Sequence, residues 1–269
     1  MDAPSHIMNT MFVEVDRVTK TYPGQEGEPL TALQEVSLEI PRGKFVSVVG
    51  PSGCGKSTLL MLLAGLYTPG SGEIRLDGAS VDRPCTNIGI VFQSPVLLDW
   101  RTVLDNVMIQ IEVRGLDKKT YRPRALELLS AVGLRGFENA YPHQLSAGMR
   151  QRVSICRALI HDPPLLLMDE PFGALDALTR EQLMIDLQRM WAETRKTIFF
   201  VTHSIREAVF QSDQVILMSP RPGRIERIWE IDLPRPRRLK MAATSEFGRY
   251  MEEITDVLMR DGVIREEPE

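Results

Sequence analysis

The nine residues from Gly50 to Thr58 constrain the fold of this chain more than any other segment. They read Gly-Pro-Ser-Gly-Cys-Gly-Lys-Ser-Thr and match the pattern G-x-x-x-x-G-K-[ST]. An apolar stretch of strand character, Phe45 to Val49, precedes them, and an apolar helical stretch, Leu59 to Ala64, follows. A strand, a glycine-rich loop and a helix in this order turn backbone N–H groups and the positive end of the helix dipole toward an anion. The sequence therefore predicts a phosphate-binding loop, or P-loop.

The residues of the P-loop have separate predicted roles. The predicted nucleotide-binding set is Gly50, Pro51, Ser52, Gly53, Cys54, Gly55, Lys56, Ser57 and Thr58. Lys56 supplies a positive charge to the phosphates, and Ser57 offers a hydroxyl ligand to Mg2+. The alternative is a plain glycine-rich turn with a surface lysine, which the placement between strand and helix disfavours. Cys54 also raises a redox-switch hypothesis, because a helix N-terminus lowers the pKa of a thiol; otherwise a small residue simply fits there.

Composition narrows the class of protein. The chain has 269 residues, of which 43% are hydrophobic and 25% charged, and its formal net charge is −4. It therefore lacks the excess of positive charge typical of nucleic-acid-binding proteins, and we expect no nucleic-acid partner. No apolar run reaches the roughly 18 residues needed to cross a bilayer, and Met1 to Thr10 has no signal-peptide character, so we expect a cytoplasmic location. Three widely separated cysteines suggest neither a disulfide framework nor a metal site.

Apolar runs predict an α/β fold. Two alternating stretches, Phe12 to Val18 and Val36 to Ile40, are typical of antiparallel strands near the N-terminus. Continuous apolar runs predict buried parallel strands over Phe45–Val49, Ile88–Phe92, Leu165–Met168 and Ile198–Thr202. Ligands of such sheets bind beyond the carboxyl ends of the strands. We thus predict a P-loop NTPase core with a mostly parallel sheet, an N-terminal antiparallel layer and a helical subdomain over about 96–160, which includes a helix over Arg124–Val132.

The last part of the chain is predicted to be a linker and a helix. Residues 12–233 form the predicted nucleotide-binding domain, in which a turn over Ser219–Arg224 joins strands Val215–Met218 and Ile225–Ile231. In the predicted C-terminal unit, 234–269, apolar residues recur at helical spacing and indicate an amphipathic helix that covers the body of the protein. The basic residues before it are expected to be a solvated linker, or alternatively a contact for anionic lipid; they are Arg235, Arg237, Arg238 and Lys240.

Two consecutive carboxylates end the predicted strand over Leu165–Met168. Asp169 is the candidate ligand of Mg2+, and Glu170 is the candidate base that polarises a water for attack on the terminal phosphate. Taken alone, an apolar run that ends in Asp-Glu indicates only a strand that leaves the core. Behind a P-loop, the catalytic interpretation is favoured.

A second helix start carries a further anion site. Ser146 stands in Leu145-Ser146-Ala147-Gly148-Met149-Arg150-Gln151-Arg152 and is a natural N-cap for the helix that follows. A free serine hydroxyl and a close glycine amide at a helix N-terminus also suit a phosphate. Two such helix starts in one chain suggest a dimer in which each copy completes the other's site.

At this point the chain resembles the ATP-binding subunits of ABC transporters over nearly its whole length. The P-loop, the LSGGQ-like segment at Ser146, Asp169-Glu170 and a later His203 occur in that family's order. The resemblance implies that Gln93 senses Mg2+ and the attacking water and that Tyr22 stacks on adenine. Without the others, Gln93 would be a strand-end amide and Tyr22 a turn aromatic.

The resemblance also assigns residues to the dimer seam. Ser146 and Gly148 would reach the γ-phosphate held by the partner's P-loop, Asp176 would lie at the seam, and His203 would contact the γ-phosphate. Alone, Asp176 would be read as a helix cap and His203 as a satisfied histidine at a strand end. Two departures stand out, since Ala147 replaces the usual glycine and Met149 the frequent glutamine. We expect activity to survive with a weaker signature contact.

Further motifs resemble the nitrate, sulfonate and taurine importer branch, notably those around Trp100 and over Ser219–Arg224. Such importers pair two ATPase chains, as a homodimer or paired subunits, with two membrane-spanning permease subunits and an external solute-binding protein. This implies a peripheral place on the cytoplasmic face of the inner membrane and a groove at Gln93–Val107 for the permease. Trp100 would anchor that groove or pack in the helical core. A soluble ABC ATPase acting on nucleic acid or ribosomes, or a P-loop switch protein without transport, remain as alternatives.

Overall fold

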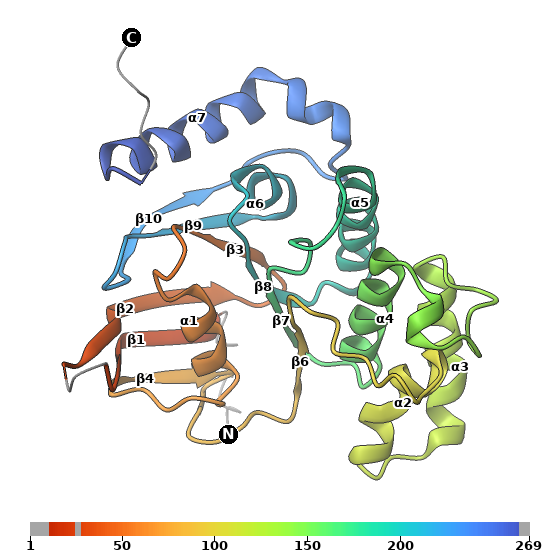
Figure 1. The fold of residues 1–269 in the computed structure, drawn as a ribbon. Coiled ribbons are helices and arrows are strands. Elements are labelled where there is room, and N and C mark those ends of the chain that lie inside the picture. The colour runs from red at the N-terminus through yellow and green to blue at the C-terminus, as the bar shows by residue number, and fades with distance from the viewer. Residues whose placement is uncertain (1–10, 25–27, 264–269) are drawn as a thin grey trace, which may run out of the picture.

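The part of the chain that the structure describes forms a four-stranded and a six-stranded sheet (Figure 1). The computed structural model describes residues 11–24 and 28–263; our expectation for Met1–Thr10 and the predicted end of the C-terminal unit, 264–269, lie outside them. Within the described residues, the first sheet has the order β2-β1-β4-β5 and is antiparallel. Its strands are β1 Met11–Tyr22, β2 Leu30–Pro41, β4 Ser71–Leu76 and β5 Ala79–Ser80.

The second sheet has the order β10-β9-β3-β8-β7-β6. Its strands are β3 Phe45–Val49, β6 Ile88–Val91, β7 Leu165–Asp169, β8 Thr197–Val201, β9 Gln214–Met218 and β10 Ile225–Glu230. The four predicted parallel strands are confirmed, and they are neighbours in the order β3, β8, β7, β6. β10 pairs antiparallel with β9 at the edge. The predicted fold class, an ABC ATPase core with an antiparallel N-terminal layer, is confirmed.

Successive side chains along the parallel strands point to opposite faces of the sheet and pack in two separate cores. Phe45, Met168 and Phe200 pack on one face with residues of α4 Ala147–Leu159, α5 Ala177–Thr194, α6 Ile205–Gln211 and α7 Ser245–Arg260. Val46, Leu167 and Phe199 pack on the other face with α1 Lys56–Leu63 and the antiparallel sheet. The helix that follows the P-loop and the helix that follows Ser146 therefore cover opposite faces of one sheet, as Figure 1 shows.

A third core joins α2 Val103–Val113, α3 Lys118–Ala131 and α4. The predicted helix over Arg124–Val132 is the second half of α3. The helix begins earlier because the carboxylate of Asp117 accepts hydrogen bonds from the N–H groups of Lys119 and Thr120. This core spans the region of the predicted helical subdomain, whose boundaries remain a prediction.

The predicted solvated linker is wrong for Arg237. Its side chain is only 4% exposed, and its guanidinium donates hydrogen bonds to the carbonyls of Val209, Phe210, Ser212 and Ile231. Arg235 pairs with Asp213 at 2.8 Å. Arg235 and Arg237 are therefore bound to the body, because the last carbonyls of α6 need donors, whereas Arg238 and Lys240 are exposed.

The C-terminal helix covers the body, as predicted. α7 follows a short 3-10 helix, Leu239–Ala243, and runs across the top of the molecule in Figure 1. Its buried residues, Phe247, Tyr250, Ile254, Val257 and Leu258, belong to the same core as α5 and α6. A search of the described residues finds no helix with the length and apolar character to cross a membrane.

Candidate nucleotide-hydrolysis site

The candidate site lies at the carboxyl edge of the parallel sheet. β3 is followed by Gly50, β7 ends at Asp169, and β8 is followed by Thr202 and His203. β7 and β8 are hydrogen-bonded neighbours and β3 lies beside β8, so the three segments meet at one edge. Most of the predicted hydrolysis residues come together here, as the position of ligands in such sheets led us to expect.

The P-loop folds around the side chain of Lys56. This side chain is 5% exposed, and Nζ donates hydrogen bonds to the carbonyl oxygens of Gly50 (2.8 Å) and Pro51 (3.0 Å). Gly55 precedes α1 with φ +103, and a Cβ there would lie 2.5 Å from Leu33 Cδ2 and 2.9 Å from a backbone oxygen of β2. Only glycine fits at this position. The loop is thus held closed around a buried ammonium group.

The redox hypothesis for Cys54 is wrong. The residue is 1% exposed, and burial raises the pKa of its thiol despite the opposing charge and hydrogen bonds of Lys56. A buried thiol with a raised pKa is mostly protonated and inert. The alternative, that a small residue simply fits in the loop, is what the structure favours.

Two oxygen donors meet at the start of α1. Ser57 Oγ donates a hydrogen bond of 3.0 Å to Asp169 Oδ1. Burial raises the pKa of Asp169 above its ordinary value, the hydrogen bond from Ser57 opposes this, and the charge of Glu170 adds to it. Among the described residues, no cluster of three or more His, Cys, Asp or Glu could enclose a metal ion. A hydroxyl and one carboxylate fit Mg2+, which commonly takes one or two protein oxygens and completes its shell with water and phosphate.

Both oxygens of the Glu170 carboxylate have partners. His203 Nδ1 lies 2.9 Å from Oε1, and Gln93 Nε2 donates to Oε2 at 3.3 Å. The backbone of Glu170 has φ +45, in the left-handed region that costs a non-glycine residue roughly 1–2 kcal/mol. Its N–H is held by the carbonyl of Val201 at 2.9 Å. Strain of this kind is retained where the surrounding structure fixes a side chain in place.

Sequence reasoning missed the hydrogen bonds of the two residues that flank His203, Thr202 and Ser204. Thr202 Oγ1 donates to Glu207 Oε2 at 2.6 Å and accepts from the N–H of Ser204 at 3.0 Å. Burial raises the pKa of Glu207, and the hydrogen bond from Thr202 opposes this. The pattern Ser204-x-x-Glu207 at the start of α6 was the available signal, since it is typical of a helix N-terminus.

The residues predicted for the dimer seam gather elsewhere in the chain. Ser146 Oγ accepts from Met149 N at 3.3 Å, which confirms it as the N-cap of α4. Asp176 caps α5 by accepting from the N–H of Thr179, and this interaction lowers the pKa of its carboxyl. A Cβ on Gly148 would lie 2.3 Å from Thr179 Cγ2, so the two helix starts are in close contact. No hydrogen bond within the described residues links Ser146 or Asp176 to the P-loop.

Two predicted aromatic contacts have different outcomes. Tyr22, at the end of β1, lies beside the P-loop, because its hydroxyl donates to Thr58 Oγ1 at 3.4 Å and its ring meets Tyr67 edge-on at 6.0 Å. Its stacking on adenine remains a prediction. Trp100 is 74% exposed, so the alternative in which it packs in the helical core is wrong.

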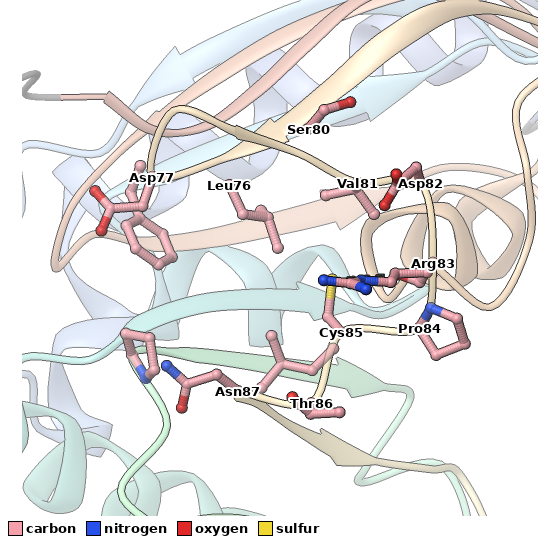
Figure 2. A pocket seen from close by; sticks show the side chains of 13 residues that line it. Leu76, Asp77, Ser80, Val81, Asp82, Arg83, Pro84, Cys85, Thr86 and Asn87 are labelled. Atoms are coloured by element: carbon pink, nitrogen blue, oxygen red, sulfur yellow. Dashed lines mark hydrogen bonds between the residues drawn. The ribbon is translucent and has the colours of Figure 1, made fainter.

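A separate hollow of about 300 Å³ lies between the two sheets (Figure 2). It is lined by residues 76–77, 80–88, Phe12 and Pro164. Ile88 and Pro164 stand at the amino ends of β6 and β7, so this hollow opens at the opposite edge of the sheet. None of the predicted site residues lines it, and it is not the candidate nucleotide site.

Comparisons with known proteins agree with this geometry. Residues 33–173 match the family model described as ABC transporter. The taurine import ATP-binding protein TauB of Rhizobium johnstonii is 46% identical, over 92% of this chain and 96% of its own length. The aliphatic sulfonates import ATP-binding protein SsuB of Bacillus cereus is 40% identical, over 95% and 99%. This chain therefore belongs to the family of ABC transporter ATP-binding proteins.

Solved structures of one relative show a dimer and a nucleotide-bound state of that relative. A bacterial ABC transporter cassette determined as a dimer is 36% identical, with a TM-score of 0.73 over 82% of this chain and 100% of the cassette. The same cassette is also solved as a dimer in a post-hydrolysis state bound to ADP and phosphate. The chain is an ABC ATPase, which hydrolyses ATP to drive transport.

Proposed function

We propose that the residues at the carboxyl edge of the sheet hydrolyse ATP in named roles. Lys56 and the P-loop amides bind the phosphates, while Ser57, Asp169 and Gln93 hold Mg2+, which when bound neutralises charge on the phosphates. Glu170 accepts a proton from water as the water oxygen bonds to the γ-phosphorus and the bond to the ADP oxygen breaks. The observation that carries this proposal is the carboxylate of Glu170, contacted on one oxygen by His203 and on the other by Gln93.

We propose further that two copies close over two nucleotides. Ser146 and Gly148 stand at the start of α4, which packs on the face of the sheet opposite to α1. The phosphate that they contact would therefore be one held by the P-loop of a second chain. Moving an open–closed equilibrium from 1:99 to 99:1 needs about 5.5 kcal/mol. Two nucleotides, each gaining two charged hydrogen bonds of about 1.5–3 kcal/mol, supply about 6–12 kcal/mol before losses. Hydrolysis removes the γ-phosphate that these contacts require, and the dimer reopens.

The proposed cargo is a small anion of the taurine or aliphatic sulfonate type, taken up by an importer. Its support is the likeness to taurine and aliphatic sulfonate import ATP-binding proteins over more than nine-tenths of the chain. Permease subunits in the inner membrane would bind a hollow of about 410 Å³ whose lining includes Phe92, Val96, Leu98 and Val113. Exposed Trp100 lies two residues beyond Leu98 and would anchor the contact.

Transport by the assembled complex tests this function. The chain is purified from membranes with the subunits that accompany it, reconstituted in vesicles, and supplied with ATP and an external solute-binding protein. Uptake of labelled taurine or an alkanesulfonate is expected, and Glu170→Gln should abolish it. Uptake of nitrate alone would contradict the cargo. Salt-dependent retention on nucleic acid without any membrane subunit would favour a soluble ABC ATPase instead.

A further inference from the structure

The turn between β9 and β10, Ser219–Arg224, is exposed over most of its length but contacts the P-loop through Arg221 and Gly223. Arg221 Nε and Nη2 each donate a hydrogen bond of 3.1 Å to the same carbonyl oxygen, that of Gly53. The approach is close, since a Cβ on Gly53 would lie 2.8 Å from Arg221 Nη2. One guanidinium group therefore caps one peptide unit of the phosphate-binding loop.

Backbone contacts join this turn to β2 on one side and to the P-loop on the other. The N–H of Gly223 donates to the carbonyl of Ala32 and its own carbonyl accepts from the N–H of Gln34, both at 3.0 Å. A Cβ on Gly223 would lie 1.9 Å from the carbonyl oxygen of Cys54, which no side chain could tolerate. The turn thus fills the space between β2 and the P-loop.

The turn also has internal support that does not involve the P-loop. Ser219 N donates to the carbonyl of Arg224 at 3.0 Å, and Arg224 N donates to Ser219 Oγ at 3.1 Å. Arg224 points its guanidinium to Gln34 Oε1 on β2 at 2.6 Å. Arg221 and Arg224 are therefore a matched pair, because both are arginines of one turn and only Arg221 contacts the loop that is proposed to hold phosphate.

The bond to Gly53 controls the direction of an N–H group. The carbonyl of Gly53 and the N–H of Cys54 belong to one planar peptide unit and point in opposite directions. Gly53 has φ +75, and glycine rotates freely in the absence of restraint. With its carbonyl bonded to Arg221, the N–H of Cys54 points the opposite way and donates a long 3.3 Å hydrogen bond to Pro51 O within the loop. A phosphate oxygen in the loop would compete with the carbonyl of Pro51 for this N–H.

We propose that Arg221 is a positioning residue that holds the P-loop in its nucleotide-binding shape before nucleotide arrives. It contacts no reacting atom, and the inference rests on the proposed nucleotide site. Because the loop holds the phosphates common to both nucleotides, losing Arg221 weakens ADP and ATP to the same extent. A residue that instead contacted a second copy in the closed dimer would affect ATP alone.

The test measures the Kd of Mg·ADP and Mg·ATP by fluorescent-nucleotide titration of the full chain. Arg221→Ala should raise both values about tenfold, with kcat at saturating ATP within about twofold of wild type. Arg221→Lys, which can donate to one carbonyl but not from two positions, should give intermediate values. Arg224→Ala is the matched control and should bind as wild type, and the unfolding temperature without nucleotide should be equal for the two alanine variants.

Two results would overturn the inference. One is nucleotide affinity in Arg221→Ala equal to that of Arg224→Ala, and the other is a change in ATP-dependent dimerisation with unchanged ADP affinity. The variant Lys56→Ala distinguishes a wrong role for Arg221 from a wrong assignment of the nucleotide site. If Lys56→Ala abolishes nucleotide binding and Arg221→Ala does not weaken it, only the role of Arg221 is wrong. If Lys56→Ala also binds normally, the nucleotide site itself is wrong.

Discussion

His203 Nδ1 lies 2.9 Å from Glu170 Oε1, so a residue after β8 contacts the carboxylate that follows β7. With Gln93 on the other oxygen, the carboxylate is held between side chains from the segments that follow β6 and β8. These two contacts fix the orientation of the carboxylate.

Glu170→Gln should leave ATP binding intact and lower turnover by at least about 100-fold, because the amide cannot accept the proton of water. The variant should accumulate as an ATP-bound dimer. Steady-state hydrolysis and light scattering after gel filtration measure the two effects. A variant that stays monomeric at saturating ATP would count against the closing-dimer mechanism.

Ser146→Arg should lower hydrolysis by about 100-fold while ADP affinity stays within about twofold, since the serine caps α4 on the face of the sheet away from α1. Mixing this variant with Lys56→Ala should restore part of the activity, because a mixed dimer has one site with both changes and one with neither. Full activity in Ser146→Arg alone would show that the site is not shared between chains.

Asp169→Asn should make the nucleotide-free protein more stable at neutral pH. Burial raises the pKa of Asp169, so the stability that this group contributes is present below its unfolded pKa of about 3.9 and is lost as pH rises through the folded pKa. The variant's advantage in unfolding temperature should therefore grow from pH 4 to pH 7. Mg·ATP should stabilise the wild type and not the variant; an advantage independent of pH would contradict this reasoning.

Arg237→Met should lower the free energy of unfolding by about 3 kcal/mol, because the carbonyls of Val209, Ser212 and Ile231 lose the guanidinium donor inside the fold. The carbonyl of Phe210 keeps its hydrogen bond from Gln188 Nε2. Denaturant titration measures the change. Arg238→Ala, at an exposed neighbouring position, should stay within about 0.5 kcal/mol of wild type. Equal effects of the two substitutions would mean that the buried guanidinium contributes no more than a surface one.

Trp100→Ala should change the unfolding free energy by no more than about 0.5 kcal/mol, since the ring is 74% exposed. Basal ATP hydrolysis of the isolated chain should also be unchanged. Copurification with membrane subunits should fall at least about tenfold if the ring anchors the permease contact. Unchanged copurification would assign that contact to other residues.

The residues with local signals were predictable from the sequence. The P-loop, the strand that ends at Asp169 and the cap at Ser146 are each determined by a few consecutive residues, because strand, loop and helix propensities act over that range. The positions of β4 and β5 were not predicted, since their short and half-polar sequences carry no clear period. The register that brings Gln93 to Glu170 also had no local signal.

The basic residues before the C-terminal helix show where a clear sequence signal was misleading. Arg235 and Arg237 read as solvated because charge is a strong surface signal in a sequence. Only the folded chain places Arg237 at the end of α6, where backbone carbonyls lack partners. Likewise, the position of Cys54 at a helix start predicted a lowered pKa for its thiol, but burial in the folded chain raises that pKa instead.

By itself, the sequence determined that this chain has a phosphate-binding loop, a parallel sheet around it and a carboxylate pair at a strand end, because each is written in contiguous residues. The tertiary structure decided which groups meet: His203 and Gln93 on Glu170, and Arg221 on the carbonyl of Gly53. These pairs are separated by 33 to 168 positions, and only strand order and packing bring them within hydrogen-bond distance.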